Sequence, residues 1–167
     1  ITRSNIIFIG QGIDTTTIVG GFGIENQQNI TFKQMTVTNT SSSEFGKDGI
    51  CMRNAKVELI DVALKGCSHC ALGIPNSTSE TTLVATRCEF ANSRVGAAVH
   101  GSLTSATFKN CVFNDNSLYG VYGYQSTIHL HGEATAIHSN GISGIFAHNS
   151  GKVLIHLPSH HNTSYNN

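Results

Sequence analysis

The chain has few charged residues and lacks any long apolar run. Charged side chains make up 12% of its 167 residues, and the formal net charge is +0. Nucleic-acid-binding domains carry a basic patch or stripe, so this composition predicts no nucleic-acid partner. No apolar run approaches the roughly 18 residues that a membrane span needs, so no membrane-spanning helix is expected.

Sustained helical periodicity is also missing, and a short motif that recurs about every 24 residues takes its place. The copies are Gly49–Asn54, Ala71–Asn76, Gly96–Gly101, Gly120–Gln125 and Gly144–Asn149. Their second residues fall at positions 50, 72, 97, 121 and 145, so the successive steps are 22, 25, 24 and 24 residues. A period of this size is typical of repeat proteins in which each unit packs on its neighbours.

A second apolar segment, with a change of phase in it, lies between the copies. Ile30 and Phe32 alternate, and Met35 and Val37 alternate, but the step from 32 to 35 is three residues. The same spacing recurs at positions 57, 59, 62 and 64, at 83, 85, 88 and 90, and at 106, 108, 111 and 113. Because strands place alternate side chains on one face, the three-residue step requires a bend that keeps both pairs inward. Each repeat is therefore expected to contain three short strands joined by corners.

The predicted fold is all-β: a right-handed, single-stranded parallel β-helix of about six coils, each with three short strands. The right-handed sense is the one favoured for parallel crossovers. Residues 1–157 are expected to form the β-helix, and residues 158–167 a polar C-terminal tail or cap. The N-terminal end shows no helix to cover it, so a missing upstream segment or a partner is expected to cap that coil.

Polar residues recur at one corner, five residues before the inward position of each Gly-containing strand. These positions hold Cys67, Asn92, Asn116 and Asn140. Asn tolerates left-handed backbone and can hydrogen-bond along a stack, so an asparagine ladder is predicted there. Cys88 and Cys111 share one inward slot in consecutive coils and are interpreted as small core residues. The Cys67-x-x-Cys70 pair is interpreted as two thiols at a corner, because a zinc site would want a second pair nearby.

The coil length, the inward aliphatic stacks and the Asn corners resemble the right-handed parallel β-helix proteins of the pectin-lyase-like class. The entry segment at residues 6–18 looks like the first coil of many such proteins, and the resemblance covers roughly residues 5 to 157. It is a resemblance of architecture, since neither the paired-Asp run of polygalacturonases nor the Asp-Pro-His-Asp motif of mannuronan epimerases is present. Enzymes of this class use the corresponding sheet surface for polysaccharides.

Two outward columns are expected on the Gly-containing strands if Ile50 and Met52 point inward. The first column holds Gly23, Cys51, Gly73, Ala98, Tyr122 and Phe146, and the second holds Glu25, Arg53, Pro75, His100, Tyr124 and His148. Exposed aromatic rings flanked by imidazoles suit sugar rings. The predicted glycan-binding residues are therefore Tyr122, Tyr124, Phe146, His100 and His148. The alternative is that a loop or a neighbouring chain covers these side chains.

The predicted role is a non-enzymatic recognition or structural module without a cofactor, with a glycan as the ligand. Of the acidic residues only Glu25 lies in the two columns, with Asp48 at the strand edge. The carboxylate pair of a glycosidase and the oxygen cluster of a calcium site are therefore not expected. One alternative is a lyase or epimerase for an acidic glycan, with Tyr124, His100, His148 and Arg53 as its machinery. Another is a protein-interaction or assembly module.

A second group of histidines lies elsewhere in the repeat. His129 and His131 alternate outward on one strand, and His156 is expected to stack beside His131 one coil later. Two imidazoles at that spacing could share a zinc or copper ion, with His129, His160 or His161 as the third ligand. The spacing matches no known motif and histidines are ordinary on polar strand faces, so the sequence alone assigns no metal site.

Overall fold

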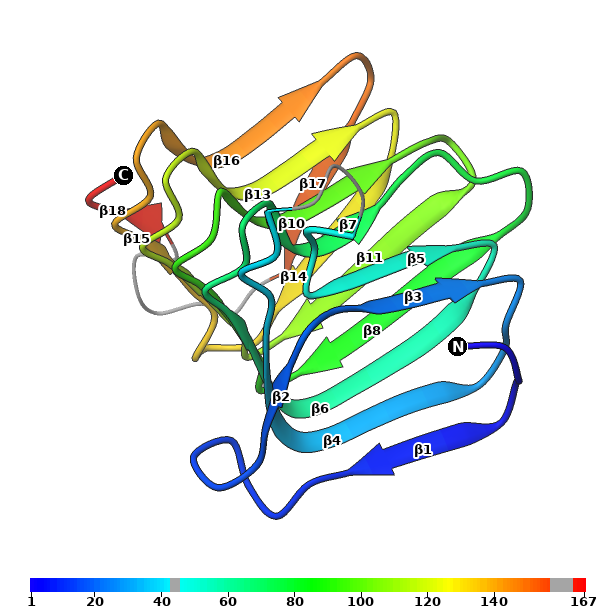
Figure 1. Cartoon of the computed structure of the whole chain (residues 1–167). Helices are drawn as coiled ribbons and strands as arrows, with labels where there is room; N and C mark the ends of the chain where they lie inside the picture. Colours follow the sequence, from blue (N-terminus) through cyan, green and yellow to red (C-terminus); the bar gives the residue numbers. More distant parts are fainter. Residues whose placement is uncertain (43–45, 157–163) are drawn as a thin grey trace.

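The computed structural model describes residues 1–42, 46–156 and 164–167. The regular structure of these residues is all β-strand, and the strands wind as a parallel solenoid of about six turns (Figure 1). Within the same residues there is no helix that could cross a membrane. The predicted all-β coil with parallel stacking is confirmed.

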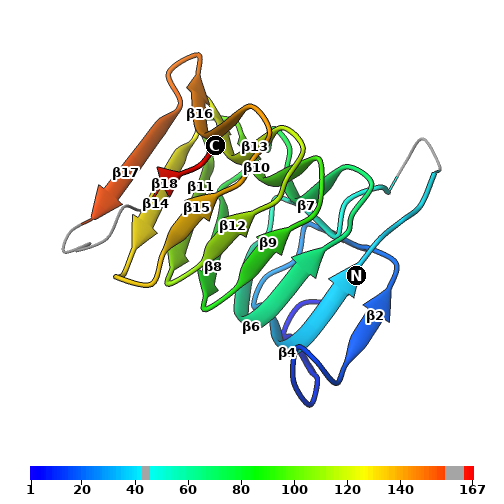
Figure 2. The same cartoon turned by 90° about the vertical axis from the view of Figure 1, so that its left-hand side faces the viewer.

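Three stacks of strands run along the solenoid, one for each side of the coil. The first contains β1 (Ile6–Ile9), the first parts of β4 (Ile30–Thr38) and β6 (Lys56–Lys65), β8 (Thr81–Thr86), β11 (Thr104–Lys109), β14 (Thr127–His131) and β17 (Lys152–His156). The second contains β2 (Thr17–Val19), the last parts of β4 and β6, β9 (Glu89–Ala91), β12 (Val112–Asn114), β15 (Ala136–His138) and β18 (Ser164–Tyr165) (Figure 2). The third contains β3 (Phe22–Glu25), β5 (Ile50–Arg53), β7 (Cys70–Ile74), β10 (Val95–His100), β13 (Tyr119–Tyr124) and β16 (Ser143–His148).

The corner between the first and second stacks explains the three-residue step in the sequence. One residue of each step has left-handed backbone, with φ between 52° and 55°. These residues are Gln34, Asp61, Arg87 and Asn110. A single left-handed residue turns the chain so that the apolar residues on both sides of it face the interior.

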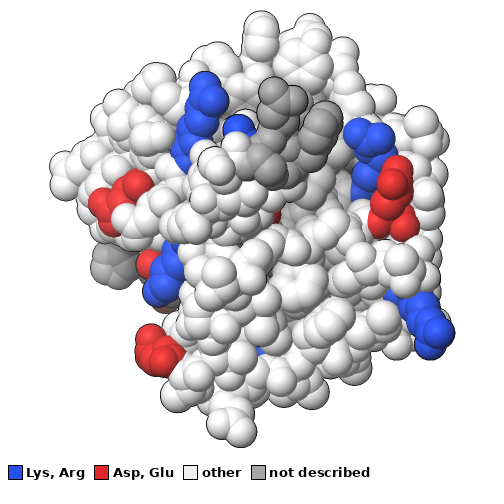
Figure 3. Space-filling view, viewed as in Figure 1, with Lys and Arg blue, Asp and Glu red and all other residues white. Residues whose placement is uncertain are grey.

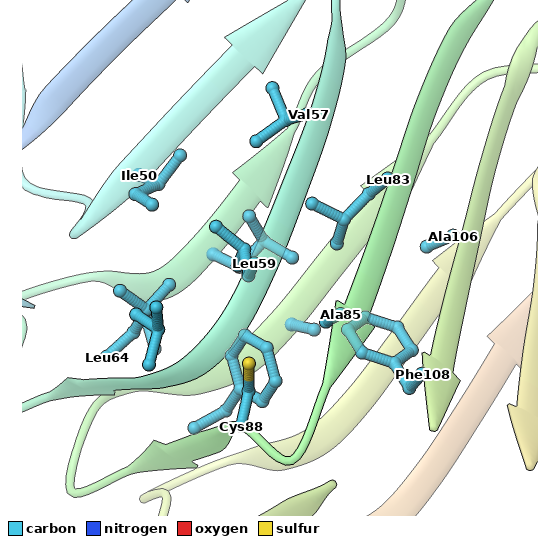
Figure 4. Close-up of a cluster of buried hydrophobic side chains, with 14 of the residues drawn as sticks. Ile50, Val57, Leu59, Leu64, Leu83, Ala85, Cys88, Ala106 and Phe108 are labelled. Carbon is cyan, nitrogen blue, oxygen red and sulfur yellow. The ribbon is translucent and has the colours of Figure 1, made fainter. Parts of the chain in front are cut away.

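The core lies inside the coil and consists of the inward residues that the spacing predicts. Ile30, Phe32, Leu59, Leu64 and Phe108 are all fully buried. Figure 4 shows side chains of neighbouring coils pointing into this interior, from Ile50 and Val57 to Ala106 and Phe108. The Phe90 and Phe113 rings stack with their centroids 4.9 Å apart and an interplanar angle of 10°. Cys88 and Cys111 are buried free thiols, as predicted.

The glycine that opens most copies of the repeated motif allows the coils to approach closely. A Cβ atom on Gly96 would lie 2.5 Å from the carbonyl oxygen of Gly120, and one on Gly120 would lie 2.7 Å from that of Gly144. Both separations are shorter than a carbon and a carbonyl oxygen tolerate. Glycine at these two positions thus leaves room for the carbonyl oxygen of the next coil.

A ladder of asparagine side chains runs along one corner, but the prediction that Asn92 belongs to it is wrong. Asn116 donates to Asn140 Oδ1 (2.9 Å), and Asn140 donates to Asn167 Oδ1 (2.8 Å). One coil earlier the ladder position is held by Ser93, whose backbone N–H donates to Asn116 Oδ1 (3.2 Å). Asn92 is exposed in left-handed backbone (φ 50°). The spacing rule fails there because Ser93 lies four residues before the inward Ala97, whereas Asn116 lies five before Val121.

The expected boundary at residue 157 lies at the start of residues 157–163, which are outside the described residues. Beyond them, β18 pairs with β15, and Asn167 extends the ladder by one rung. The division into a β-helix and a tail or cap stays a prediction, as does a partner or segment that caps the N-terminal coil.

Replacement of Asn140 by alanine is expected to lower the free energy of unfolding by about 1–3 kcal/mol, because the carbonyls of Phe113 and His138 then lose a buried donor. Urea denaturation followed by circular dichroism measures the change. Asn76→Ala is the control: its side chain is exposed, and the expected change is within about 0.5 kcal/mol. If the free energy of unfolding falls by the same amount in both variants, the hydrogen bonds of the ladder do not stabilise the protein.

Candidate functional site

The outward columns of the third stack have the register that the sequence predicts. Ala98 pairs with Tyr122, and Tyr122 pairs with Phe146. In the second column His100, Tyr124 and His148 are successive partners. At the other end of this column Glu25 pairs with Arg53, and their Oε1 and Nη1 atoms are 4.0 Å apart.

A third outward column at the start of these strands was missed by the sequence pattern. Its members are Cys70, Val95, Tyr119 and Ser143, which are successive register partners. Strict alternation back from the inward Leu72 or Val121 would place Cys70 and Tyr119 inside, but both pack on the outer face with Ala98 and Tyr122. The signal was available, because each member immediately precedes the small first residue of a motif copy.

Three rings form an aromatic tract on the outer face of β13 and β16: Tyr119, Tyr122 and Phe146. The rings of Tyr119 and Phe146 stack with centroids 5.0 Å apart at 13°, and those of Tyr122 and Phe146 with centroids 5.6 Å apart at 25°. Such stacking stabilises each pair by about 0.5–1.5 kcal/mol beyond the area it buries. Phe146 is still 38% exposed, so the tract keeps apolar ring surface available to a ligand.

Tyr124 lies between the two imidazoles, as predicted. Its ring centroid is 5.9 Å from that of His100 and 5.8 Å from that of His148. Asn149 Nδ2 donates a hydrogen bond to Tyr124 Oη (2.8 Å). Burial, with a smaller contribution from the charge of His69, lowers the pKa of His100. His100 therefore favours the neutral form, in which one ring nitrogen accepts a proton or a hydrogen bond.

Asp48 reaches into the middle of the same surface, although the sequence placed it only at a strand edge. Its Oδ1 accepts a hydrogen bond from the Cys70 backbone N–H (3.0 Å) and lies 2.8 Å from His69 Nδ1. Gly73 leaves room for it, since a Cβ there would lie 2.5 Å from Asp48 Oδ2. The sequence did contain a signal for this placement. Gly73 leaves a gap in the first outward column, and Asp48 directly precedes the motif copy that begins at Gly49.

A pocket of about 440 Å³ surrounds this carboxylate and extends to His100. A second pocket of about 650 Å³ adjoins it at Cys51, Arg53 and Pro75, and continues to Glu25. We call these two adjoining pockets the groove. At the edge of the smaller pocket, Ala98 and His100 are the register partners of Tyr122 and Tyr124 on the next strand. Figure 3 shows that charged side chains are sparse over the face of the molecule turned to the viewer.

The thiols beside the groove are poor nucleophiles. Burial and the nearby Asp48 carboxylate raise the pKa of Cys51 to about 11. The same two causes raise the pKa of Cys70, whose Sγ lies 3.3 Å from His69 Nδ1. Because the thiolate is the reactive form and a raised pKa favours the thiol, both cysteines are expected to react slowly with electrophiles near neutral pH. Cys67 contacts the Lys65 carbonyl instead, so the two cysteines of the Cys-x-x-Cys pair occupy different surroundings.

Two groups of side chains among the described residues could hold a metal ion. One is Asp48, His69 and Cys70 in the groove, and the other is His129, His131 and His156 on the first stack. His131 and His156 are register partners, as expected from the sequence. Burial, followed by the charges of His156, His129 and Lys109, lowers the pKa of His131. His160 and His161, the other predicted ligands, lie outside the described residues.

Comparison of the sequence with known protein families supports the solenoid fold. A family model described as a right handed beta helix region matches residues 5–167. No curated protein and no solved structure matches the chain. The family match concerns the architecture, so the chemistry of the groove rests on its geometry alone.

Gly73→Ala is expected to destabilise the protein by roughly 1–3 kcal/mol, because the new methyl group displaces the Asp48 carboxylate from His69 and the Cys70 backbone. The measurement is the midpoint of chemical denaturation. Gly23→Ala is a matched control in the same column, where an added Cβ meets nothing within 4 Å. If both variants unfold at the same denaturant concentration, Asp48 is not fixed as described.

Proposed function

The chain belongs to the right-handed beta helix family, and from this starting point we propose that it binds an extended, largely uncharged glycan along the third stack. The observation that carries the proposal is the aromatic tract, which continues a groove lined by imidazole, guanidinium and carboxylate groups. Rings such as Phe146 stack on the C–H faces of sugars, while the polar groups bond to hydroxyls.

The spacing of the strands supports an extended ligand. Successive strands of the stack are separated by about 4.8 Å, so neighbouring coils offer contacts at a regular interval comparable to one sugar unit. A glycan chain that runs across the strands would pass the groove residues Arg53 and His100 and then reach Tyr122 and Phe146.

The charges in the groove favour an uncharged ligand. Arg53 lies beside Glu25, and Asp48 lies beside His69. The Glu25 carboxylate is therefore paired with a cation and the Asp48 carboxylate with hydrogen-bond donors, so recognition depends on ring stacking and hydrogen bonds. Exposed ion pairs such as the one between Arg53 and Glu25 contribute only about 0–1 kcal/mol to stability, so their groups remain available for a ligand.

Tyr122→Ala and Phe146→Ala are each expected to weaken binding by roughly two- to tenfold, the range that loss of one stacking contact gives. The ligand is first identified on an array of neutral and acidic polysaccharides, and the affinities are then compared by isothermal titration calorimetry. Tyr165→Ala is the control, because it removes an equally exposed ring that stacks on His138 of the second stack. Unchanged affinity in both groove variants, or no retention of any glycan, would refute the proposal.

A second candidate function is β-elimination or epimerisation on an acidic glycan. It is favoured by one observation: Tyr124 lies between two imidazoles, and burial keeps His100 neutral and able to accept a proton. In this mechanism His100 removes the C5 proton of the uronate, the C4–C5 double bond forms as the C4–O bond breaks, and the Tyr124 hydroxyl protonates the departing oxygen, while Arg53 in the same pocket neutralises the carboxylate. In epimerisation the C4–O bond stays intact and a proton returns to C5 from the opposite side.

Tyr124→Phe separates the two functions, because it removes the hydroxyl and keeps the ring. If the protein is a lyase, ultraviolet absorbance of an unsaturated uronate rises with the wild-type protein and not with this variant. If the groove only binds, neither absorbance nor exchange of the uronate C5 proton with deuterated solvent develops with either protein, and Tyr124→Phe retains most of the affinity for the glycan. An epimerase would show that exchange without absorbance.

A further inference from the structure

Three imidazoles converge on the outer face of the first stack, away from the groove. His129 and His131 are two residues apart on β14, so both point outward. His156 on β17 is the register partner of His131. All three side chains are partly buried. The register of β14 and β17 therefore brings the three side chains to one patch of the first stack.

The ring nitrogens are close enough to share one ion. His129 Nδ1 lies 2.8 Å from His156 Nε2. The rings of His131 and His156 are parallel, at 1°, with their centroids 4.0 Å apart. One nitrogen from each of the three residues lies within 4.8 Å of the others. A tetrahedral zinc ion with Zn–N bonds of about 2.0–2.1 Å separates its nitrogens by about 3.3 Å, which is within the range of these distances. Because the lone pair of an imidazole nitrogen lies in the ring plane, the stacked rings of His131 and His156 must tilt away from their parallel arrangement to point at one ion.

We propose that His129, His131 and His156 bind a zinc ion through three imidazole nitrogens, with solvent as the fourth ligand. Zinc bound by three histidines with one open position is a recognised arrangement in proteins. Without the metal, the short contact between His129 and His156 is a hydrogen bond in which one ring donates and the other accepts. For the ion to bind, the donor ring moves its proton to its other ring nitrogen, so that both facing nitrogens offer a lone pair to the metal.

The neighbouring column adds a charge to the site. Lys109 on β11 is the register partner of His131, so its ammonium group lies on the same outward face one coil away. The ammonium group opposes the charge of the zinc ion and favours hydroxide over water as the solvent ligand. The site belongs to the first stack, so it is independent of the proposed glycan groove on the third.

The groove group of Asp48, His69 and Cys70 is the competing metal site. Its carboxylate oxygen already accepts the Cys70 backbone N–H, and its cysteine is buried. A metal there would have a thiolate ligand, whereas the histidine site has nitrogen ligands from the protein. Cobalt distinguishes the two, because only a thiolate ligand adds a sulfur-to-metal charge-transfer band.

The test uses the full chain, freed of metal by dialysis against a chelator. Zinc binding is measured by competition with a chromophoric chelator and by calorimetry. The wild-type protein is expected to bind one equivalent of zinc. His131→Ala and His156→Ala are each expected to weaken that binding by about 100-fold or more, since loss of a second-shell partner alone costs roughly 10–100-fold. His138→Ala is the matched control: its ring stacks on Tyr165 outside the group and its loss leaves zinc affinity unchanged.

Three results would overturn the proposal: no zinc binding by the wild-type protein, unchanged affinity in both histidine variants, or a thiolate band when cobalt fills the site. The cobalt spectrum is recorded on the wild-type protein, so it decides the matter even if a variant fails to fold. Circular dichroism of each variant shows whether a loss of binding reflects the ligand or the fold.

Discussion

Backbone hydrogen bonds between equivalent strands of successive coils determine which strand residues face the core and which face outward. In the third stack one line of register partners runs from Phe22 through Ile50 and Leu72 to Ala97 and beyond. A slip of one residue would exchange the inner and outer faces, so the apolar core and the parallel pairing fix each other. The outward columns, the groove and the histidine group are all consequences of this register.

Much of the fold could be predicted because side chains in a stacked coil repeat with the coil. The spacing of Ile30, Phe32, Met35 and Val37 identified the core and the corner, since only a bend can keep both pairs inside. The adjacency of Glu25 and Arg53 followed from register alone. Alternation along a regular strand and stacking between strands are strong local constraints, and neither depends on the details of the loops.

The parts that could not be predicted lie where the chain departs from regular geometry. Ser93, and not Asn92, occupies the ladder position in its coil. The segment from that position to the inward residue of the next strand is one residue shorter there than in the neighbouring coils. Tyr119 points outward because the backbone changes phase at Gly120. Asp48 enters the groove through the space that Gly73 leaves open. Each of these depends on the local conformation of one or two residues, which a period of about 24 residues does not encode.

The two candidate sites use the same scaffold in different ways. The groove combines side chains from several coils and offers rings, imidazoles and paired charges along its length. The histidine group uses two adjacent strands and brings three ring nitrogens within 4.8 Å of one another. A stack of strands suits both tasks, because residues in one column recur at the strand spacing of about 4.8 Å.

Because inner and outer columns are separate, the length of the outer surface depends only on the number of coils. Each coil adds one layer of side chains to the core and one to the outer surface. Cys88 and Cys111, for example, occupy equivalent buried positions in consecutive coils. Duplication of a coil would extend the groove by one strand spacing and leave the packing of its neighbours intact. If the groove binds an extended ligand as proposed, the number of turns sets the length of ligand that it accommodates, and single outward residues set the identity of each contact.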